Sequence, residues 1–459
     1  MSIPRPLEPP PIEKAAQRRG RFGFAAGPRF LLLSAAGLAW IIPALWNYRF
    51  LYAMLLWDLL LIVAFIADLL RLPRPQQLVV RREWHAPLSI GVNAALRVVV
   101  TNQSRVPVEV KLLDELPASQ WHGMHFADRT VAAGGSGEFT LSYTPGARGD
   151  QKTGRTFLRY QSAFRMAERW AVADLVQTVR VYPNFEHARK NSVYLARSRQ
   201  IELQIRMMRL RGMGSDFESL REYREGDELR NVCWTAAARR GKLVAKTFRV
   251  ERSQAVWIVL DCGRLMRART RGFSKLDRAV DAALCLTQLA LYSGDRVGLL
   301  AYGRAVNQRV TPGRGATQLR HIVEQLALVS EEVPEADHTR AAASLLGLQK
   351  QRGLIVWISD LAETAMTPEV IDAASQLLSR HLLIFAVIAQ PELKQQARQT
   401  PASAQGMYQV VAAQEMVYRR ELMLGRLRER GALCMEVEPG RLSAAILNQY
   451  LTVKERNLV

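Results

Sequence analysis

The chain has 459 residues, of which 63 are Lys or Arg and 42 are Asp or Glu, so its formal net charge is +21. This length predicts two or three domains, and the charge favours an anionic partner, namely a membrane surface, nucleic acid or an acidic protein. The four cysteines are widely spaced and form no Cys-x-x-Cys pair, which excludes a zinc knuckle or redox motif of that kind and predicts buried free thiols.

The N-terminal region changes abruptly in composition. Residues 1–29 are rich in proline and then in Lys and Arg, which predicts a disordered basic tail. Two apolar runs follow at residues 30–46 and 50–70, separated by three residues. At about 1.5 Å per residue each run is long enough, or nearly so, to cross a hydrocarbon core of about 30 Å. The sequence therefore predicts a transmembrane helical hairpin over residues 30–72.

Basic residues predict how this hairpin is oriented. Lys and Arg crowd the tail and recur directly after the second run, whereas the tip contains Arg49 alone. The positive-inside rule places both ends in the cytoplasm, so we expect a multi-pass protein with the bulk of its chain cytoplasmic. Asp58 lies within the second run, where an ionised carboxylate is costly. It is either protonated or reached by water, or it contacts another transmembrane helix.

Residues 76–185 carry a different pattern, of short runs that alternate between apolar and polar residues. Turn formers separate these runs, for example at 102–104, 134–137 and 145–146. Several short strands within about a hundred residues predict a β-sandwich of the immunoglobulin-like kind, although the Cys-Trp-Cys core of true immunoglobulin domains is absent.

Residues 186–254 are predicted to form a helical connector. Its first part, 186–213, is basic, which is typical of a solvated helix face and also compatible with contact to anionic lipid. Its second part concentrates six residues that an ordinary helix does not need: Arg221, Tyr223, Gly226, Asp227, Arg230 and Trp234.

Gly226 and Asp227 predict a turn, and Trp234 is expected to begin a helix that Gly241 ends. Two interpretations of this stretch stay open: a polar network that locks two elements together, or a docking or ligand patch. We predict that Asp227 accepts hydrogen bonds from Arg221 or Arg230 and that Trp234 packs beneath this pair.

Together with Phe217, Leu220, Ala238, Arg239 and Leu243, these six residues resemble the signature of the bacterial "domain of unknown function 58" proteins. The resemblance implies a protein anchored in the bacterial inner membrane, with a von Willebrand factor A-like C-terminal domain. It also implies pairing with a MoxR-type AAA+ ATPase. It supplies no established chemistry.

Residues 255–459 carry an α/β pattern. Continuous apolar runs of strand length alternate with helical stretches, as in buried parallel strands that are covered by helices on both faces. The predicted fold is a doubly wound α/β domain, and its apolar runs are AVWIVLD, RVGLLAY, GLIVWIS and LLIFAVI.

Two aspartates end strands of this predicted sheet. Asp261 resembles the first Asp of the Asp-x-Ser-x-Ser metal site of von Willebrand A domains, with Thr317 and Asp360 as the distant Thr and second Asp. Gly263 and Leu265 replace the two serines, and a hard cation needs several oxygen ligands. We therefore expect no measurable magnesium binding at near-millimolar concentration. The aspartates are expected instead to cap helices or pair with arginines.

No phosphate-binding loop, zinc-protease motif or nucleophile elbow occurs in the sequence. We therefore do not predict an enzyme, and we expect no cofactor. The favoured function is a membrane-anchored cytoplasmic scaffold or adaptor in assembly or envelope-related functions, which binds a protein partner that by resemblance is a MoxR-type ATPase. The alternative is a nucleic-acid-binding membrane protein, which only the charge favours.

Overall fold

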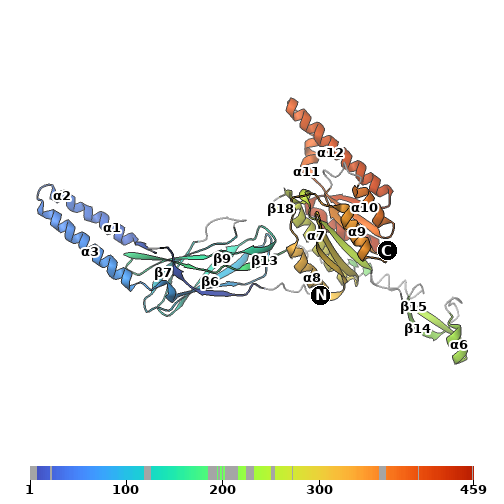
Figure 1. Ribbon diagram of the computed structural model, residues 1–459, viewed down its shortest axis with the longest axis horizontal. Coiled ribbons are helices and arrows are strands. Elements are labelled where there is room, and N and C mark those ends of the chain that lie inside the picture. The colour runs from blue at the N-terminus through green and yellow to red at the C-terminus, as the bar shows by residue number, and fades with distance from the viewer. Residues whose placement is uncertain are drawn as a thin grey trace. The chain divides into compact units, whose positions relative to one another are not determined.

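The computed structural model describes residues 8–20, 23–117, 126–184, 194, 197–198, 200–201, 216–223, 232–249, 254–270, 272–360, 369–401, 403–456 and 458. The chain divides into two compact units at the boundary between Tyr182 and Pro183, so it is a multidomain protein. The first unit combines helices with sheets, and the second contains a large α/β sheet (Figure 1).

Apolar helices lie within residues 28–71 of the first unit. α1 (Pro28–Gly37), η1 (Leu38–Trp40) and α2 (Ile41–Ala44) lie beside the single helix α3 (Arg49–Arg71) (Figure 1). α3 is the one helix in the described part of the chain that is long and apolar enough to cross a membrane. The run at 30–46 is not one continuous helix, because Pro43 lacks an amide hydrogen and crowds the preceding turn, where the 3₁₀ segment lies.

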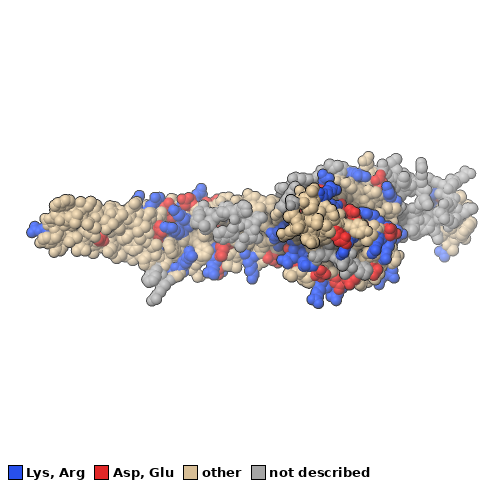
Figure 2. Space-filling view, turned by 90° about the horizontal axis from the view of Figure 1, so that it is seen from above, with Lys and Arg blue, Asp and Glu red and all other residues tan. Residues whose placement is uncertain are grey.

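We call residues 28–71 the helix pair. Gly37 allows its helices to approach closely, since a Cβ at this position would lie 2.7 Å from the Trp57 ring. The Trp57 indole also donates a hydrogen bond of 3.1 Å to the Leu33 carbonyl. In Figure 2 the helix pair is almost entirely tan, with Lys and Arg at its tip and gathered again at its foot.

The rest of the first unit, residues 8–26 and 75–182, is rich in sheet, and we call it the β region. Its sheets have the orders β1-β4-β6-β9, β10-β13-β5 and β2-β12-β11-β7-β8, with β3 also paired to β12. Side chains alternate between buried and exposed along β6 and β9, as the sequence predicted. The elements are β1 (Ile12–Ala15), β2 (Gln17–Arg18), β3 (Phe24–Ala26), η2 (Pro75–Gln77), β4 (Leu78–Trp84), β5 (Leu88–Ser89), β6 (Ala94–Asn102), β7 (Val108–Asp114), β8 (Phe126–Val131), β9 (Ser136–Tyr143), β10 (Gly149–Lys152), β11 (Thr156–Gln161), β12 (Ala167–Ala173) and β13 (Thr178–Tyr182).

The described part of the N-terminal tail is not disordered, contrary to the prediction for residues 1–29. β1 pairs antiparallel with β4, and both β2 and β3 pair antiparallel with β12. These short strands satisfy backbone groups that the edges of the two sheets would otherwise expose. The tail is therefore held chiefly by backbone hydrogen bonds, which its Pro-rich and basic composition does not reveal.

Asp68 joins the helix pair to the β region. This buried carboxylate lies in the last turn of α3 and accepts hydrogen bonds from the Ser162 hydroxyl at 2.5 Å and from the backbone amides of Met166 and Ala167 at 3.0 and 2.9 Å. The Tyr160 hydroxyl also donates to the Pro73 carbonyl at 2.8 Å. The end of α3 is consequently fixed against the connection between β11 and β12.

Arg82 joins the facing sheets of the β region. Its guanidinium is fully buried and forms an ion pair with Asp114, whose side chain is also fully buried. It donates further hydrogen bonds to the Thr153 hydroxyl at 2.8 Å and the Leu175 carbonyl at 2.7 Å. Because β4 and β7 belong to different sheets, this one side chain ties the two sheets together.

A six-stranded sheet forms the centre of the second unit, with the order β20-β19-β16-β21-β22-β23. All neighbours are parallel except β20, which is antiparallel to β19. The strand order reverses direction at β16, as in a doubly wound sheet. The strands are β16 (Ala255–Asp261), β19 (Arg296–Tyr302), β20 (Val306–Gly313), β21 (Leu354–Ser359), β22 (Leu382–Ile388) and β23 (Leu433–Val437).

Helices cover both faces of this sheet. One buried cluster unites the sheet with α9, α10 and α12, while α7 packs against the sheet between α8 and α13. The helices are α7 (Lys275–Tyr292), α8 (Gly315–Leu328), α9 (His338–Leu348), α10 (Glu369–Leu378), α11 (Pro391–Ala397), α12 (Ala404–Glu429) and α13 (Leu442–Glu455). Smaller elements are β14 (Asp216–Glu222), α6 (Trp234–Arg240), β15 (Val244–Arg249), η5 (Arg264–Arg267), β17 (Arg269–Thr270), β18 (Phe273–Ser274) and η7 (Pro439–Arg441).

We predict that Arg82→Met destabilises the β region by about 3–5 kcal/mol, because it leaves the buried Asp114 carboxylate without its cation. The control is Arg97→Met, which removes an exposed pair with Glu138 and is expected to cost less than about 1 kcal/mol. Amide hydrogen exchange in β4 and β11 of the full-length chain measures both effects. Equal protection in the two variants would show that the buried pair does not hold the sheets together.

Candidate functional site

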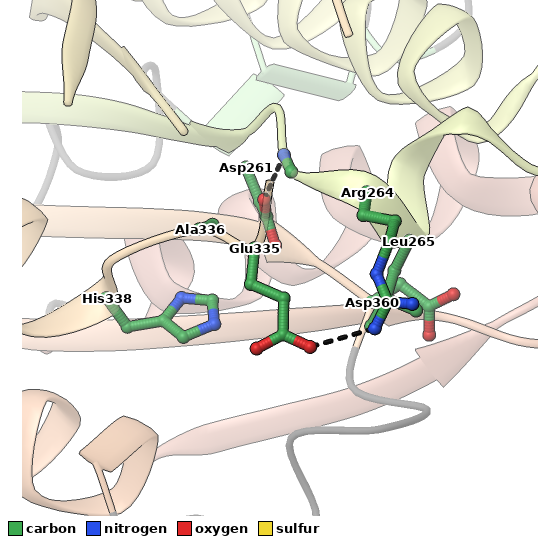
Figure 3. Close-up of a pocket in the computed structure, with 8 residues that line it drawn as sticks. Asp261, Arg264, Leu265, Glu335, Ala336, His338 and Asp360 are labelled. Atoms are coloured by element: carbon green, nitrogen blue, oxygen red, sulfur yellow. Dashed lines mark hydrogen bonds and ion pairs between the residues drawn. The ribbon is translucent and has the colours of Figure 1, made fainter. Parts of the chain in front are cut away.

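The carboxyl edge of the parallel strands is where ligand sites form in doubly wound sheets. Asp261 is the last residue of β16, and Asp360 directly follows β21, its neighbour in the sheet. A small pocket of about 20 Å³ lies between them, which is enough for one water molecule. Figure 3 shows its lining: Asp261, Gly263, Arg264, Leu265, Glu335, Ala336, His338 and Asp360.

Asp261 is almost fully buried and is held from two sides. One carboxylate oxygen accepts a hydrogen bond from the Gly263 amide at 2.7 Å, and the other accepts one from the Ser359 hydroxyl at 2.6 Å. Burial raises the pKa of Asp261 above its usual range. A Cβ at position 263 would lie 2.8 Å from the Ala336 amide nitrogen, so a serine does not fit here without displacing the loop before α9.

Asp360 is fully buried and is neutralised by two cations. Lys275, at the start of α7, donates to one oxygen, and Arg420, within α12, donates to the other at 2.6 Å. Gln390 adds a hydrogen bond of 3.1 Å to the oxygen that Lys275 contacts. The same Arg420 also donates to the Ile388 carbonyl at the end of β22, at 2.7 Å. Asp360 thus joins β21 to α7, α12 and the segment after β22. Of the two roles expected from the sequence, helix capping or pairing with an arginine, Asp360 has the second.

This pairing bears directly on the metal-site expectation. Both oxygens of Asp360 are already used, and two adjacent positive charges oppose the approach of a divalent cation. Thr317 lies in the first turn of α8 and does not line the pocket, where Glu335 and Ala336 of the loop before α9 lie instead. Across the described ranges, no group of three or more His, Cys, Asp or Glu residues could hold a metal ion.

His338 is a pocket residue that the sequence analysis did not single out. Its Nδ1 atom lies 2.8 Å from the Tyr302 hydroxyl, which accepts a hydrogen bond of 2.7 Å from the Trp357 indole. Burial lowers the pKa of His338, although the nearby Asp261 opposes this shift. Among the described residues, His338 and Asp261 thus line a pocket with space for about one water molecule.

The described signature residues lie on β14, on α6 and in the segments that directly follow them. Arg221 and Tyr223 are at the end of β14, where the Tyr223 amide donates to the Leu243 carbonyl at 2.9 Å. α6 begins at Trp234, and Gly241 follows its end with φ +62°, so the predicted helix is confirmed. Trp234 is 65% exposed, and the ion pair beneath which it was predicted to pack involves Asp227, outside the described residues.

The remaining signature residues, Gly226, Asp227 and Arg230, lie outside the described residues. The connector predicted to be helical contains two antiparallel strands besides α6 where the structure describes it. Residues 216–222 and 244–249 form strands instead of the predicted helix, and the two strands satisfy each other's backbone hydrogen-bonding groups.

α12 extends beyond the carboxyl edge. It has 26 residues, and Arg420 in its second half contacts the end of β22, so the residues before Arg420 continue for roughly 24 Å past that edge (Figure 1). Five large apolar side chains share one face of the helix, opposite the face that α12 buries against the sheet. We call them the α12 stripe: Met407 (54% exposed), Tyr408 (76%), Val411 (57%), Tyr418 (62%) and Leu422 (45%).

We predict that Lys275→Met lowers the stability of the α/β unit by about 3–5 kcal/mol, because it removes one of the two cations from the buried Asp360 carboxylate. Adding Asp360→Asn should restore part of this loss. Arg419→Met, which removes the cation from an exposed pair with Glu415, should cost less than about 1 kcal/mol. Hydrogen exchange in β16 and β21 is the measurement, and additive losses in the double variant would contradict the coupling.

We also predict that protection of α9 decreases on acidification. The native state keeps His338 neutral while the unfolded chain binds a proton below about pH 6.5, so the stability that neutral His338 contributes is lost as pH falls through that value. His338→Gln keeps a polar partner for Tyr302 and does not titrate, so it should flatten this dependence. The measurement is α9 exchange at about pH 7.5 and 5.5, corrected for intrinsic rates; parallel slopes for parent and variant would refute the role of His338.

Comparison with known proteins gives a family match over part of the chain. Residues 219–402 match the family model described as "Protein of unknown function DUF58", which confirms the predicted resemblance over this region. A relative is "Uncharacterized protein Rv1480" of Mycobacterium tuberculosis (strain ATCC 25618 / H37Rv), 30% identical over 152 residues. The same match is found with "Uncharacterized protein Mb1516" of Mycobacterium bovis. The matched segment covers 32% of this chain and about half, 48%, of each relative.

Among solved structures, conserved hypothetical protein BatB from Bacteroides thetaiotaomicron matches with a TM-score of 0.29 and 12% identity, over 44% of this chain and 100% of that one. A β-glucosidase from Listeria innocua in complex with isofagomine matches with a TM-score of 0.13 and 17% identity, over 23% of this chain and 16% of that one. At these TM-scores neither structure bears on the function of the chain. What the comparisons establish is the similarity of residues 219–402 to the DUF58 family model.

Proposed function

We propose that this chain is a membrane-anchored scaffold or adaptor that binds a protein partner, rather than an enzyme. By the resemblance in the second unit, the partner is a MoxR-type AAA+ ATPase, and the pair acts in assembly or envelope-related functions. The observation that carries the proposal is the α12 stripe, because large apolar side chains gathered on one exposed helix face mark interaction sites. The stripe has two parts, Met407–Val411 and Tyr418–Leu422, and the exposed Glu415–Arg419 ion pair lies between them.

The helix pair supplies the anchor in this proposal. α3 has 23 residues, and its apolar side chains are largely exposed along its length, which suits a lipid environment. In the proposed topology, α1 and α2 complete a second pass, and both ends of the pair face the cytoplasm of a bacterial inner membrane. Asp68 then fixes the foot of α3 to the β region, which acts as a spacer.

The α/β unit supplies the binding surface. We assign it to the von Willebrand A-like class on its strand order and on the two aspartates at the carboxyl edge. In this chain Lys275 and Arg420 neutralise Asp360, so the proposed docking does not use a bridging metal ion. Arg420 instead positions α12 so that its apolar stripe projects past the same edge. Docking then buries Tyr and Val side chains against the partner.

We predict that the double variant Tyr408→Asp/Val411→Asp binds the ATPase at least about tenfold more weakly, because a central aromatic anchor contributes about 2 kcal/mol or more to an interface. The control is Val176→Asp, the same change at a residue of the β region that is 48% exposed. Full-length chains are purified from membranes, co-purified ATPases are identified by mass spectrometry, and affinities are measured at low and high salt.

If the Tyr408→Asp/Val411→Asp variant bound the ATPase as tightly as the parent chain does, the α12 stripe would not be the docking surface. Absence of any AAA+ ATPase from the purified material, together with steeply salt-dependent binding of DNA, would overturn the proposed function and support the nucleic-acid alternative. Unchanged exchange in β16 and β21 serves to show that the variant is folded.

A further inference from the structure

A second pocket lies at the foot of the helix pair. It has a volume of about 460 Å³ and opens between the end of α3 and the strands β2, β3 and β12. Among the described residues, its lining holds three guanidinium groups and no carboxylate: Arg18, Gly23, Phe24, Leu69, Arg74, Pro75, Gln76 and Arg169. A pocket of this size admits a small ligand, and three arginines in its wall select one that is anionic.

The chain holds these arginines in place. Arg169, on β12, donates hydrogen bonds to the Leu69 carbonyl at 2.9 Å and the Pro73 carbonyl at 3.3 Å, two acceptors at the end of α3. Arg18 ends β2, which pairs with β12. Gly23 has φ +55°, and a Cβ there would lie 2.7 Å from the Arg18 Cγ, so glycine leaves the space that the Arg18 side chain occupies.

The pocket also lies at a defined depth. The apolar stretch of α3 from Phe50 to Leu70 spans about 31 Å, which matches a hydrocarbon core of about 30 Å. Leu69 is therefore at the inner limit of that core, and Arg74 lies just beyond it, at the level of lipid phosphates. Figure 2 shows Lys and Arg side chains at this foot of the helix pair, with Asp and Glu side chains among them. This step rests on the proposed membrane anchoring.

We propose that the pocket binds the phosphate group of an anionic phospholipid. Arg18 and Arg74 offer forked donors to the phosphate oxygens, and Phe24 and Leu69 provide an apolar wall for the first carbons of the acyl chains. A zwitterionic headgroup brings its own cation and is disfavoured beside three guanidiniums. Because Asp68 lies one residue before Leu69, the bound lipid ties the clamped end of α3 to the membrane surface.

The test uses full-length chain reconstituted in phosphatidylcholine vesicles with and without about 30% phosphatidylglycerol, with bound lipid counted by native mass spectrometry after extraction. The parent is expected to retain phosphatidylglycerol selectively. Arg18→Gln/Arg74→Gln should lower this retention at least about tenfold. Arg81→Gln/Arg97→Gln removes the same charge from two exposed pairs and should retain the lipid as the parent does.

If both double variants lost phosphatidylglycerol retention equally, the retention would depend on general surface charge, and the proposed pocket site would be wrong. The single variant Arg74→Gln, at an exposed position, is used if the double variant loses exchange protection in β12, and it should still weaken retention. Inorganic phosphate binding to the detergent-solubilised chain, without lipid retention, would assign the site to a soluble phosphate and refute the lipid proposal. A chain that floats with both vesicle types but shows no lipid preference refutes this inference alone, whereas failure to float with either refutes the membrane anchor.

Discussion

The architecture of the α/β unit depends on the buried carboxylate of Asp360. A charge removed from water needs compensation, and here the compensation comes from elements far apart in the sequence: Lys275 of α7, Arg420 of α12 and Gln390 after β22. Apolar packing alone would allow α12 to slide along the sheet, because hydrophobic contact is not directional. The Arg420–Asp360 pair fixes where α12 crosses the carboxyl edge and hence how far its exposed half projects.

The first unit uses the same device twice. Arg82 sets the two sheets against each other, and Asp68 sets α3 against the turn before β12. In each case one buried charged side chain contacts several hydrogen-bonding partners at once, so a shift of either element would break more than one of these contacts. Such groups add little net stability compared with an apolar core, but they discriminate strongly against shifted arrangements. The chain therefore specifies its geometry with a few buried charges and fills the remaining space with aliphatic side chains.

The sequence predicted the features that depend on the local order of apolar, polar and turn-forming residues. The apolar runs gave the parallel strands, Trp234 and Gly241 bounded α6, and Asp261 and Asp360 were placed at one edge of the sheet. Long-range side-chain contacts were missed: His338 lines the pocket from the first turn of α9, and Lys275 contacts Asp360 from the first turn of α7, and no local periodicity reveals these contacts. Thr317 was chosen by residue type, but the topology places it in α8 and away from the pocket. The strands β1 to β3 pair through their backbones, which composition does not encode.

The two proposed contact surfaces rest on different physics, and this separates their functions. Arginine–phosphate contact at the foot of α3 is electrostatic and weakens as salt screens the charges. Contact through the α12 stripe buries apolar surface and is little affected by moderate salt. Residues matched by the family model end at 402, whereas α12 begins at Ala404, so Asp261 and Asp360 lie within the matched region, and Arg420 and the stripe lie beyond it. In the proposed function, the Asp360–Arg420 pair positions α12, and the apolar side chains that α12 presents would select the docked partner.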